Sequence, residues 1–263
     1  MQADYDPLYE YKIQNKLNRF FFTIYKKTYY IAVSKYVKRL FMKRYKLPKN
    51  KIRLIFDGIS PEFVYNTKSM SFKSHKKIRF VGTVSRVAVD RGIKEFIETA
   101  YLTAKVFPQV KFIFAGMIEK DFYSSYPEWT NLVNSLNVKK NIEFRSRFIN
   151  RKALKNYYKS LDIFFISAPQ FALPNVAIEA LLMVKPVVGA AIGGIPEIVT
   201  SRLNGIRTSY PSAPLFTEAI LTLLQNDEQR QQFGCQAKKT AEKNFLSKEI
   251  YPHLLALYKY VEA

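Results

Sequence analysis

The amino-acid sequence predicts an α/β fold, a doubly wound parallel sheet of the Rossmann-like type that follows a short, mostly helical N-terminal segment. Two observations carry this prediction. From residue 77 onward, short runs of β-branched and aromatic residues alternate with stretches of helical periodicity, as in successive βαβ units. Before that point, residues 66–77 are polar and lack an apolar period, which indicates a linker. With 263 residues and 48% apolar content, the chain can fill a sizeable core.

The N-terminal segment is expected to contain two strands and a helix. Tyr29–Val33 is a short run of aromatic and β-branched residues, which predicts a buried strand. Ser34 is a suitable N-cap for a helix over Lys35–Tyr45, whose apolar residues share one face. Lys51–Phe56 predicts a second strand, and Asp57 begins the turn that ends it.

The remaining sequence is expected to form five or so βα units. Strands are predicted at Ile78–Val81, Val110–Ala115, Ile142–Phe144, Ile163–Ile166 and Pro186–Gly189, and helices at Ile93–Val106, Tyr126–Leu136, Arg151–Ser160, Asn175–Met183, Ile195–Val199 and from Ala213 onward. Ligands of such sheets bind beyond the carboxyl ends of the strands. The loops that follow the strands are therefore the candidate sites.

The formal net charge is +21, and much of it is concentrated between Lys12 and Arg53, where fourteen Lys or Arg occur without any Asp or Glu. Phe and Tyr are interleaved with these cations, as in segments that bind an anionic membrane surface. Two other interpretations stay open: a nucleic-acid surface, and a solvated face that reflects a composition rich in Lys and Tyr.

The sequence offers little for targeting, disulfide or metal chemistry. It shows neither a secretory signal nor an uninterrupted apolar run long enough to cross a bilayer, so a cytoplasmic location is expected. The single cysteine, Cys235, cannot form an internal disulfide, and the distant His75 and His253 suggest no zinc cluster. We therefore expect no metal site and no permanently bound cofactor.

The loop after the first strand of the predicted domain begins at Gly82-Thr83 and ends at Arg91-Gly92. A glycine after a strand allows a ligand to approach the backbone, and the helix that follows offers free amides and the positive end of its dipole. This pattern favours phosphate binding, although a glycine turn after a strand is common in any α/β domain.

A second loop region extends from Ser167 to Glu197. Pro174 is suited to a helix start, so Asn175, Val176 and Ala177 are expected to present unpaired N–H groups to an anion. Glu179, one turn further, can accept two hydroxyl hydrogen bonds from a ribose diol. The alternative is an acid favoured by the helix dipole, with Gly193-Gly194 an ordinary turn.

These motifs bring the sequence close to a known family. The segments PNVAIEA, KPVV and GGIPEIV, followed by Asn204-Gly205, resemble the donor-site signature of family 4 retaining glycosyltransferases of GT-B fold. Upstream, AVSKYVKRLFMKRYKLPKNKIRLIFDGIS is similar to the junction that precedes the C-terminal domain of that family. The resemblance covers roughly residues 29–261.

The resemblance implies a domain organisation and a set of roles. Residues 1–67 correspond to the end or remnant of the N-terminal GT-B domain, 76–245 to the nucleotide-sugar-binding domain, and 246–263 to a C-terminal helix that packs back on the N-terminal segment. Glu179 is implied to bind the ribose, and the amides of residues 175–177 the diphosphate. Arg91 is implied to neutralise the leaving diphosphate, with Arg86 as its substitute. The donor-binding set is Gly82, Thr83, Arg86, Gly92, Asn175, Val176, Ala177, Glu179, Gly193 and Gly194, and the catalytic set is Arg91 and Glu179.

The sequence also departs from the family pattern. Phe171 occupies the position of the glutamate that contacts the transferred sugar, Val184 and Ser146 replace usual glycines, and the first loop is about three residues longer. Only about seventy residues precede the linker, fewer than an acceptor domain requires.

Two functional hypotheses follow from the resemblance. The first is a hexosyltransferase-type enzyme that moves sugar from a nucleotide-diphosphate donor to a glycan or lipid-linked acceptor with retention. Such an enzyme could act at the inner face of the membrane through Lys12–Arg53, with a partner chain supplying the acceptor domain. The second is a non-catalytic nucleotide-sugar-binding or regulatory module. Nucleic-acid binding is disfavoured because no recognised nucleic-acid module is present.

Overall fold

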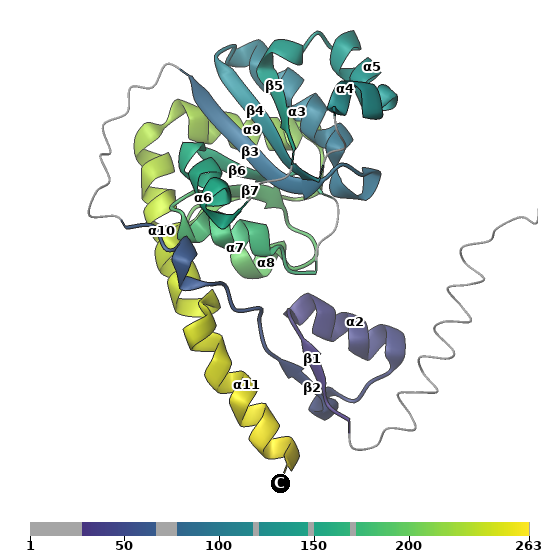
Figure 1. Ribbon diagram of the computed structural model, residues 1–263, viewed down its shortest axis with the longest axis vertical. Helices are drawn as coiled ribbons and strands as arrows, with labels where there is room; N and C mark the ends of the chain where they lie inside the picture. The colour runs from purple at the N-terminus through teal and green to yellow at the C-terminus, as the bar shows by residue number, and fades with distance from the viewer. Residues whose placement is uncertain (1–27, 67–77, 118–120, 147–149, 169–171, 263) are drawn as a thin grey trace, which may run out of the picture.

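The computed structural model describes residues 28–66, 78–117, 121–146, 150–168 and 172–262. Its centre is a sheet of six parallel strands in the order β5-β4-β3-β6-β7-β8 (Figure 1). The strands are β3 (Arg79–Arg86), β4 (Val110–Met117), β5 (Ile142–Arg145), β6 (Ile163–Ile166), β7 (Val187–Ala190) and β8 (Gly205–Thr208). This confirms the predicted doubly wound parallel sheet.

Helices cover both faces of this sheet because successive strand residues point to opposite sides. One face is packed by α6 (Arg151–Ser160), α7 (Asn175–Leu182), α8 (Ile195–Ile198) and part of α10 (Asp227–Phe245). The other is packed by α3 (Ile93–Val106), α4 (Phe122–Ser125), α5 (Pro127–Ser135) and α9 (Ala213–Gln225). On β4, Ile113 and Ala115 belong to the first core, and Phe112 and Phe114 to the second.

The chain order reverses between β3 and β6, which are neighbours in the sheet although two strands lie between them in sequence. From β3 the sheet grows through β4 and β5 in one direction, and from β6 through β7 and β8 in the other. Such a switch point opens a crevice at the carboxyl ends of the two central strands. It determines where the candidate site lies.

The described part of the N-terminal segment forms a small unit of its own. Strands β1 (Tyr30–Ala32) and β2 (Ile52–Leu54) pair in parallel, and α2 (Lys35–Tyr45) connects them. Ser34 caps α2 as predicted, because its hydroxyl accepts a hydrogen bond from the N–H of Val37 at 3.0 Å. Short 3-10 turns follow at Lys49–Lys51 and Pro61–Phe63.

The last helix, α11 (Ser247–Glu262), contacts this N-terminal unit (Figure 1). Ile250 and Leu257 are buried with Ile55, and Tyr29 packs against the same cluster. Tyr29 also meets Tyr260, with ring centroids 5.5 Å apart. At the start of α11, the N–H of Ser247 donates to the carbonyl of Ile59 at 3.0 Å, and the N–H of Ile59 donates to the carbonyl of Phe245 at 2.8 Å. Main-chain bonds thus join the segment after β2 to the junction of α10 and α11.

An ion network of two buried arginines and a partly exposed carboxylate holds the amino end of β3 to the junction of α9 and α10. The Arg79 side chain is 7% exposed and donates to both carboxylate oxygens of Asp227, at 2.8 and 2.6 Å. Arg230 donates to the same carboxylate at 2.8 Å and to the carbonyl of Leu223. Each guanidinium is thus compensated, as burial of a charge requires.

The structure extends one predicted strand, leaves the predicted linker outside the described residues, and adds a strand that was not predicted. This added strand is β8, which begins at Gly205 and pairs with β7. The first strand of the main sheet was expected at Ile78–Val81, but β3 continues to Arg86 because it pairs with β4 over eight residues. The predicted linker at 66–77 lies almost wholly outside the described residues. In the described ranges, none of the helices is both long and apolar enough to span a membrane.

Candidate functional site

The loops after β3 and β6 meet at the switch point. Gly92 has φ +71°, and a Cβ there would overlap the carbonyl of Ser167. Only glycine accommodates both the left-handed conformation and this close approach. The Ser167 hydroxyl also donates to the carbonyl of Arg91 at 3.4 Å. The first predicted loop and the beginning of the second are therefore in direct contact.

Gly82 and Thr83 do not lie in a loop, contrary to the sequence prediction. Both are inside β3, and a Cβ on Gly82 would overlap the Tyr157 hydroxyl and Leu161. That hydroxyl donates to the carbonyls of Thr83 at 2.8 Å and Ile113 at 3.0 Å. Burial raises the pKa of Tyr157 far above its usual range, which keeps the phenol a donor. The absence of a side chain at Gly82 therefore leaves room for Tyr157 of α6 and for Leu161 to pack on the sheet.

Arg86 and Arg91 share one counter-ion, Asp90. The Arg86 guanidinium contacts the Asp90 carboxylate at 2.9 Å, and Nε of Arg91 lies 3.4 Å from the same oxygen. Arg91 is the better enclosed, with 28% of its side chain exposed against 54% for Arg86. The sequence analysis gave Asp90 no role, because residue spacing does not show that its carboxylate pairs with both arginines.

Helix α7 begins directly after Pro174, as predicted, but one of the three amides predicted to be unpaired has a partner. Pro174 is the N-cap residue, and the described residues provide no partner for the backbone N–H groups of Asn175 and Val176. The N–H of Ala177 is not free, because it donates to the Pro174 carbonyl at 2.9 Å. Within the described part of the chain, two amides rather than three are left to bind an anion at this helix end.

The side chain of Asn175 contacts the N-terminal segment. Its amide nitrogen donates to a carboxylate oxygen of Asp57 at 3.3 Å. Its buried carbonyl oxygen has no hydrogen-bond partner among the described residues. The sequence predicts only a turn at Asp57, because a contact between residues 118 positions apart cannot be seen in a local sequence pattern.

Glu179 is half-buried and accepts a hydrogen bond from the Tyr158 hydroxyl at 2.7 Å. Burial raises the pKa of Glu179, the Tyr158 hydrogen bond and the charge of Arg151 oppose that rise, and Glu62 adds to it. Arg151 itself forms an ion pair with Glu62. Glu179 thus has a specific buried hydrogen-bond partner, Tyr158. An acid that is favoured only by the helix dipole would need no such partner.

The turn at Gly193-Gly194 returns the chain to the start of α7. Gly193 has φ +57°, and a Cβ on Gly194 would overlap the carbonyl of Ala172, two residues before Pro174. Both ends of the second predicted loop region are therefore packed together. Phe171, which replaces the family glutamate, lies outside the described residues, whereas Val184, which replaces a family glycine, has φ +63°. The backbone at Val184 keeps the left-handed conformation that glycine tolerates best.

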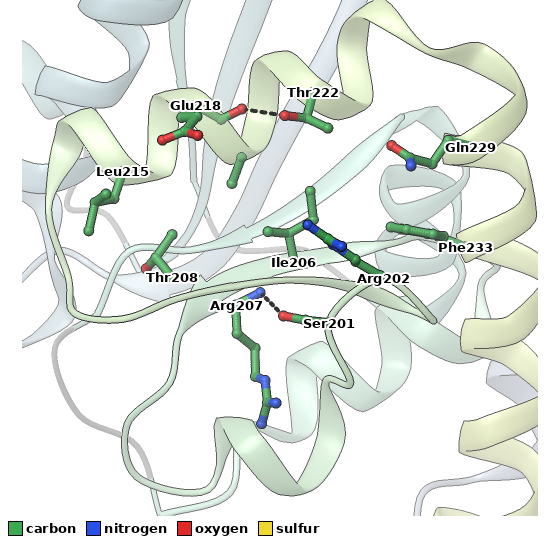
Figure 2. A pocket seen from close by; sticks show the side chains of 11 residues that line it. Ser201, Arg202, Ile206, Arg207, Thr208, Leu215, Glu218, Thr222, Gln229 and Phe233 are labelled. Atoms are coloured by element: carbon green, nitrogen blue, oxygen red, sulfur yellow. Dashed lines mark hydrogen bonds between the residues drawn. The ribbon is translucent and has the colours of Figure 1, made fainter.

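A pocket of about 570 Å³ lies elsewhere, along the outer edge of β8 (Figure 2). Helices α9 and α10 form its other walls through Leu215, Glu218, Gln229 and Phe233, and Arg202 lies across it in Figure 2. None of the predicted donor residues is among the described residues that line it. The described ranges also hold no group of three or more acidic, His or Cys side chains arranged to bind a metal ion.

Replacing Gly92 with alanine is expected to destabilise the protein by about 3 kcal/mol. About 1–2 kcal/mol comes from the left-handed backbone, and about 1–3 kcal/mol from the overlap with Ser167. The melting temperature should fall by about 6–12 °C. Gly189→Ala is the matched control, because its Cβ would meet Ile166 at 3.4 Å and its φ is not positive. Equal melting temperatures for the two variants would contradict the close contact.

Comparison with known proteins adds an independent line of evidence. The family model for glycosyl transferases group 1 matches residues 66–240. An uncharacterised glycosyltransferase of Methanocaldococcus jannaschii, MJ1607, is 29% identical over 205 residues, which are 74% of this chain and 50% of that protein. The capsular polysaccharide biosynthesis glycosyltransferase CapM of Staphylococcus aureus is 23% identical over 87% of this chain and 60% of its own. The chain thus spans about half to two thirds of these relatives.

Solved structures show the same fold. Anabaena HepE, solved in complex with UDP and glucose, superposes with a TM-score of 0.80 at 17% identity, over 94% of this chain and 67% of that one. At 17% identity, this similarity shows a shared fold and does not show a shared function. The family match covers most of the chain and includes the β3 loop, α7 and the Gly193-Gly194 turn. The chain therefore belongs to the group 1 glycosyl transferase family and has the Rossmann-like parallel sheet of GT-B proteins.

Proposed function

We propose that this chain is the donor-binding half of a family 4 retaining glycosyltransferase that uses a nucleotide-diphosphate sugar. The observation that carries the proposal is the contact of Gly92 with Ser167 at the switch point. The next helix along the chain after Ser167 is α7, where the amides of Asn175 and Val176 have no partner among the described residues and Glu179 is half-buried. The neighbour HepE was solved with UDP and glucose, which supports this class of ligand.

Most of the predicted residues have a role in this proposal. Glu179 accepts hydrogen bonds from the two ribose hydroxyls, and the N–H groups of Asn175 and Val176 bind the diphosphate. Arg91, beside the Gly92 contact, neutralises the negative charge that develops on the leaving diphosphate. Gly193-Gly194 allows the sugar to approach the backbone. Gly82 and Thr83 support the site from within β3 rather than by contact.

The proposed transfer proceeds with retention of configuration. An acceptor oxygen forms a bond to the anomeric carbon on the face from which the diphosphate departs. The bond between that carbon and the diphosphate oxygen breaks, and the acceptor proton passes to the leaving phosphate. This route needs no separate catalytic base. A glycan or a lipid-linked sugar is the proposed acceptor, and a hexose is the proposed transferred group.

The acceptor side of the cleft is proposed to come from additional protein, either a partner chain, a longer form of this polypeptide, or a second copy. The β1-β2 sheet has only two strands in the described chain, and such a sheet is marginal by itself. Ile31 on β1 is 40% exposed. An added domain that pairs with this sheet would cover it and close the cleft.

A peripheral location on the inner face of the membrane is also proposed. Helix α2 carries Lys and Arg but no acidic residue in its sequence KYVKRLFMKRY. Nearby, Lys51 and Arg53 lie over the ring of Tyr29, at 4.5 and 5.7 Å from its centroid. Pelleting with liposomes should occur with anionic but not neutral lipid and should weaken with salt. Absent or salt-insensitive binding would refute this location.

Calorimetry with a panel of nucleoside diphosphates, followed by a donor-hydrolysis assay, tests the main proposal. The expected result is binding of at least one nucleotide and release of sugar from its donor. Binding without hydrolysis or transfer, even with acceptor extracts, would instead support a non-catalytic nucleotide-sugar-binding or regulatory module. No binding to any nucleotide would reject both.

Binding of UDP-glucose is expected to weaken on acidification at a higher pH than an ordinary glutamate would give. The ribose needs the ionised Glu179 carboxylate, and burial raises its pKa from the usual 4.5. Affinity should thus increase as pH rises through the raised pKa and then level off. Calorimetry between about pH 4 and about pH 8 measures this profile. Glu179→Gln should bind weakly with a flat profile, and a profile identical to the wild type would contradict the assignment.

A further inference from the structure

Glu197, in the sequence GGIPE after β7, connects the donor loops to the N-terminal unit. One carboxylate oxygen accepts a hydrogen bond from the backbone N–H of Lys35 at 2.7 Å. The other accepts from the N–H of Tyr36 at 2.9 Å. These bonds join residues about 160 positions apart in the sequence. The family resemblance gave Glu197 no role.

The two bonds complete the capping of α2. The first N–H groups of a helix have no partner inside the helix. Ser34 satisfies the N–H of Val37, and Glu197 satisfies those of Lys35 and Tyr36. The negative charge also lies at the positive end of the α2 dipole. Because α2 has no acidic residue in its own first turn, this charge comes from the main domain.

Glu197 is held rigidly with respect to the predicted diphosphate site. It lies in α8 between Ile195 and Ile198, which are 0% and 1% exposed. Gly194, directly before α8, packs against the carbonyl of Ala172 on the segment that leads into α7. A displacement of α8 therefore has to move either α2 or the start of α7.

A second contact joins the N-terminal segment to α7 directly. Asn175, the first residue of α7, donates to Asp57 of the N-terminal segment at 3.3 Å. The first turn of α7 is thus braced by Asp57 directly and by α2 through Glu197. A group held by two such contacts has less freedom to move, which is what a preformed anion site requires.

We infer that Glu197 is a positioning residue that couples the N-terminal unit to the first turn of α7. In the protein without ligand, this coupling fixes the amides proposed to hold the diphosphate. Where nucleotide binds at α7, as in the proposed function, linkage requires that binding stabilise the α2 contact by the same factor. The coupling itself exists without nucleotide, so it can be tested separately from the proposed function.

Amide hydrogen exchange on the full chain tests the inference. In Glu197→Ala, exchange at Lys35 and Tyr36 should accelerate about tenfold or more, as for loss of charge-assisted hydrogen bonds. Exchange at Ala177 and Ile178 in α7 should accelerate with it, by a smaller factor. Glu197→Gln keeps one acceptor oxygen and the side-chain shape, so it should give an intermediate effect at both places.

Two controls separate positioning from general loss of stability. Glu128→Gln removes an exposed carboxylate on α5 and should change neither group of amides. Asp227→Ala disrupts the ion network of Arg79 and Arg230, so it should accelerate exchange throughout the main sheet without selecting α2 and α7. Unchanged exchange at α7 in Glu197→Ala, with α2 affected, would overturn the coupling. Unchanged exchange at α2 would overturn the capping.

Calorimetry with UDP completes the experiment. We expect affinity for UDP to fall about 5–20-fold in Glu197→Ala, in the lower part of the range of about 5–150-fold that is typical of coupling between sites. A wild-type chain that does not bind UDP or any other nucleotide contradicts the proposed function, while the exchange results still decide the role of Glu197. A wild type that binds UDP and a Glu197→Ala variant of equal affinity would overturn the link to the donor site.

Discussion

Replacing Arg91 with glutamine is expected to reduce sugar transfer by a factor of about 10²–10³ in kcat, with a smaller change in KM. Loss of one group that stabilises transition-state charge has effects of this size. Arg91 lies on the switch-point loop, next to the Gly92 contact with Ser167. Release of UDP and formation of product from UDP-glucose measure the change. Arg91→Lys should restore part of the rate, because it keeps the charge but not the guanidinium geometry.

The control for Arg91 is Arg86→Gln, because both guanidinium groups contact Asp90. Arg86 is the more exposed of the two, so its loss should change kcat by less than about threefold, the range of surface ion pairs. If Arg86→Gln reduced kcat more than Arg91→Gln, Arg86 would be the residue that neutralises the leaving diphosphate. Equal rates for wild type and both variants would reject an arginine in that role.

Replacing Glu179 with alanine is expected to weaken nucleotide binding by a factor of about 100 or more. Two hydroxyl hydrogen bonds to a carboxylate contribute about 1.5 kcal/mol each, and 1.4 kcal/mol corresponds to about tenfold in affinity. Calorimetry with UDP measures the loss. The free base and phosphate fragments should be affected much less, because neither carries the ribose diol.

Tyr158→Phe provides the comparison for Glu179→Ala. It removes the 2.7 Å hydrogen bond to the carboxylate but keeps the buried ring. Binding should weaken by about tenfold at most, since Glu179 loses orientation but keeps its charge. Melting temperatures of both variants report whether the fold is intact. A folded Glu179→Ala protein that binds UDP as well as the wild type would disprove the ribose assignment.

Local sequence patterns predicted most of the helices and short strands closely, but they missed β8, the strand at the edge of the sheet beside β7. The predicted helices Lys35–Tyr45 and Arg151–Ser160 and the strand Ile163–Ile166 have the same bounds in the structure. Each has signals inside itself, such as the Ser34 cap or a run of apolar residues. The end of β3 was wrong because strand length depends on a partner, and β4 supplies eight paired residues.

The site was predicted less completely, because its contacts also depend on residues that lie far apart in the sequence. Spacing indicated Gly92 and Glu179, but it could not show that Asp90 pairs with two arginines or that Tyr158 binds Glu179. The contacts of Asp57 with Asn175 and of Glu197 with α2 join residues more than a hundred positions apart. Such contacts depend on the tertiary fold. The free N–H predicted at Ala177 was wrong because the first turn of α7 closes early on Pro174.

The contact between Tyr29 and Tyr260 has a consequence for the order in which the chain folds. Their hydroxyls are 3.4 Å apart although 231 positions separate them in the sequence. A growing chain exposes β1, α2 and β2 early, but the helix that covers Ile55 is synthesised only after the main sheet. The six-stranded sheet can form in the interval from neighbouring segments. Docking of α11 on the N-terminal unit thus follows synthesis of the main sheet, and until then Ile55 and Tyr29 lack the cover that α11 gives them.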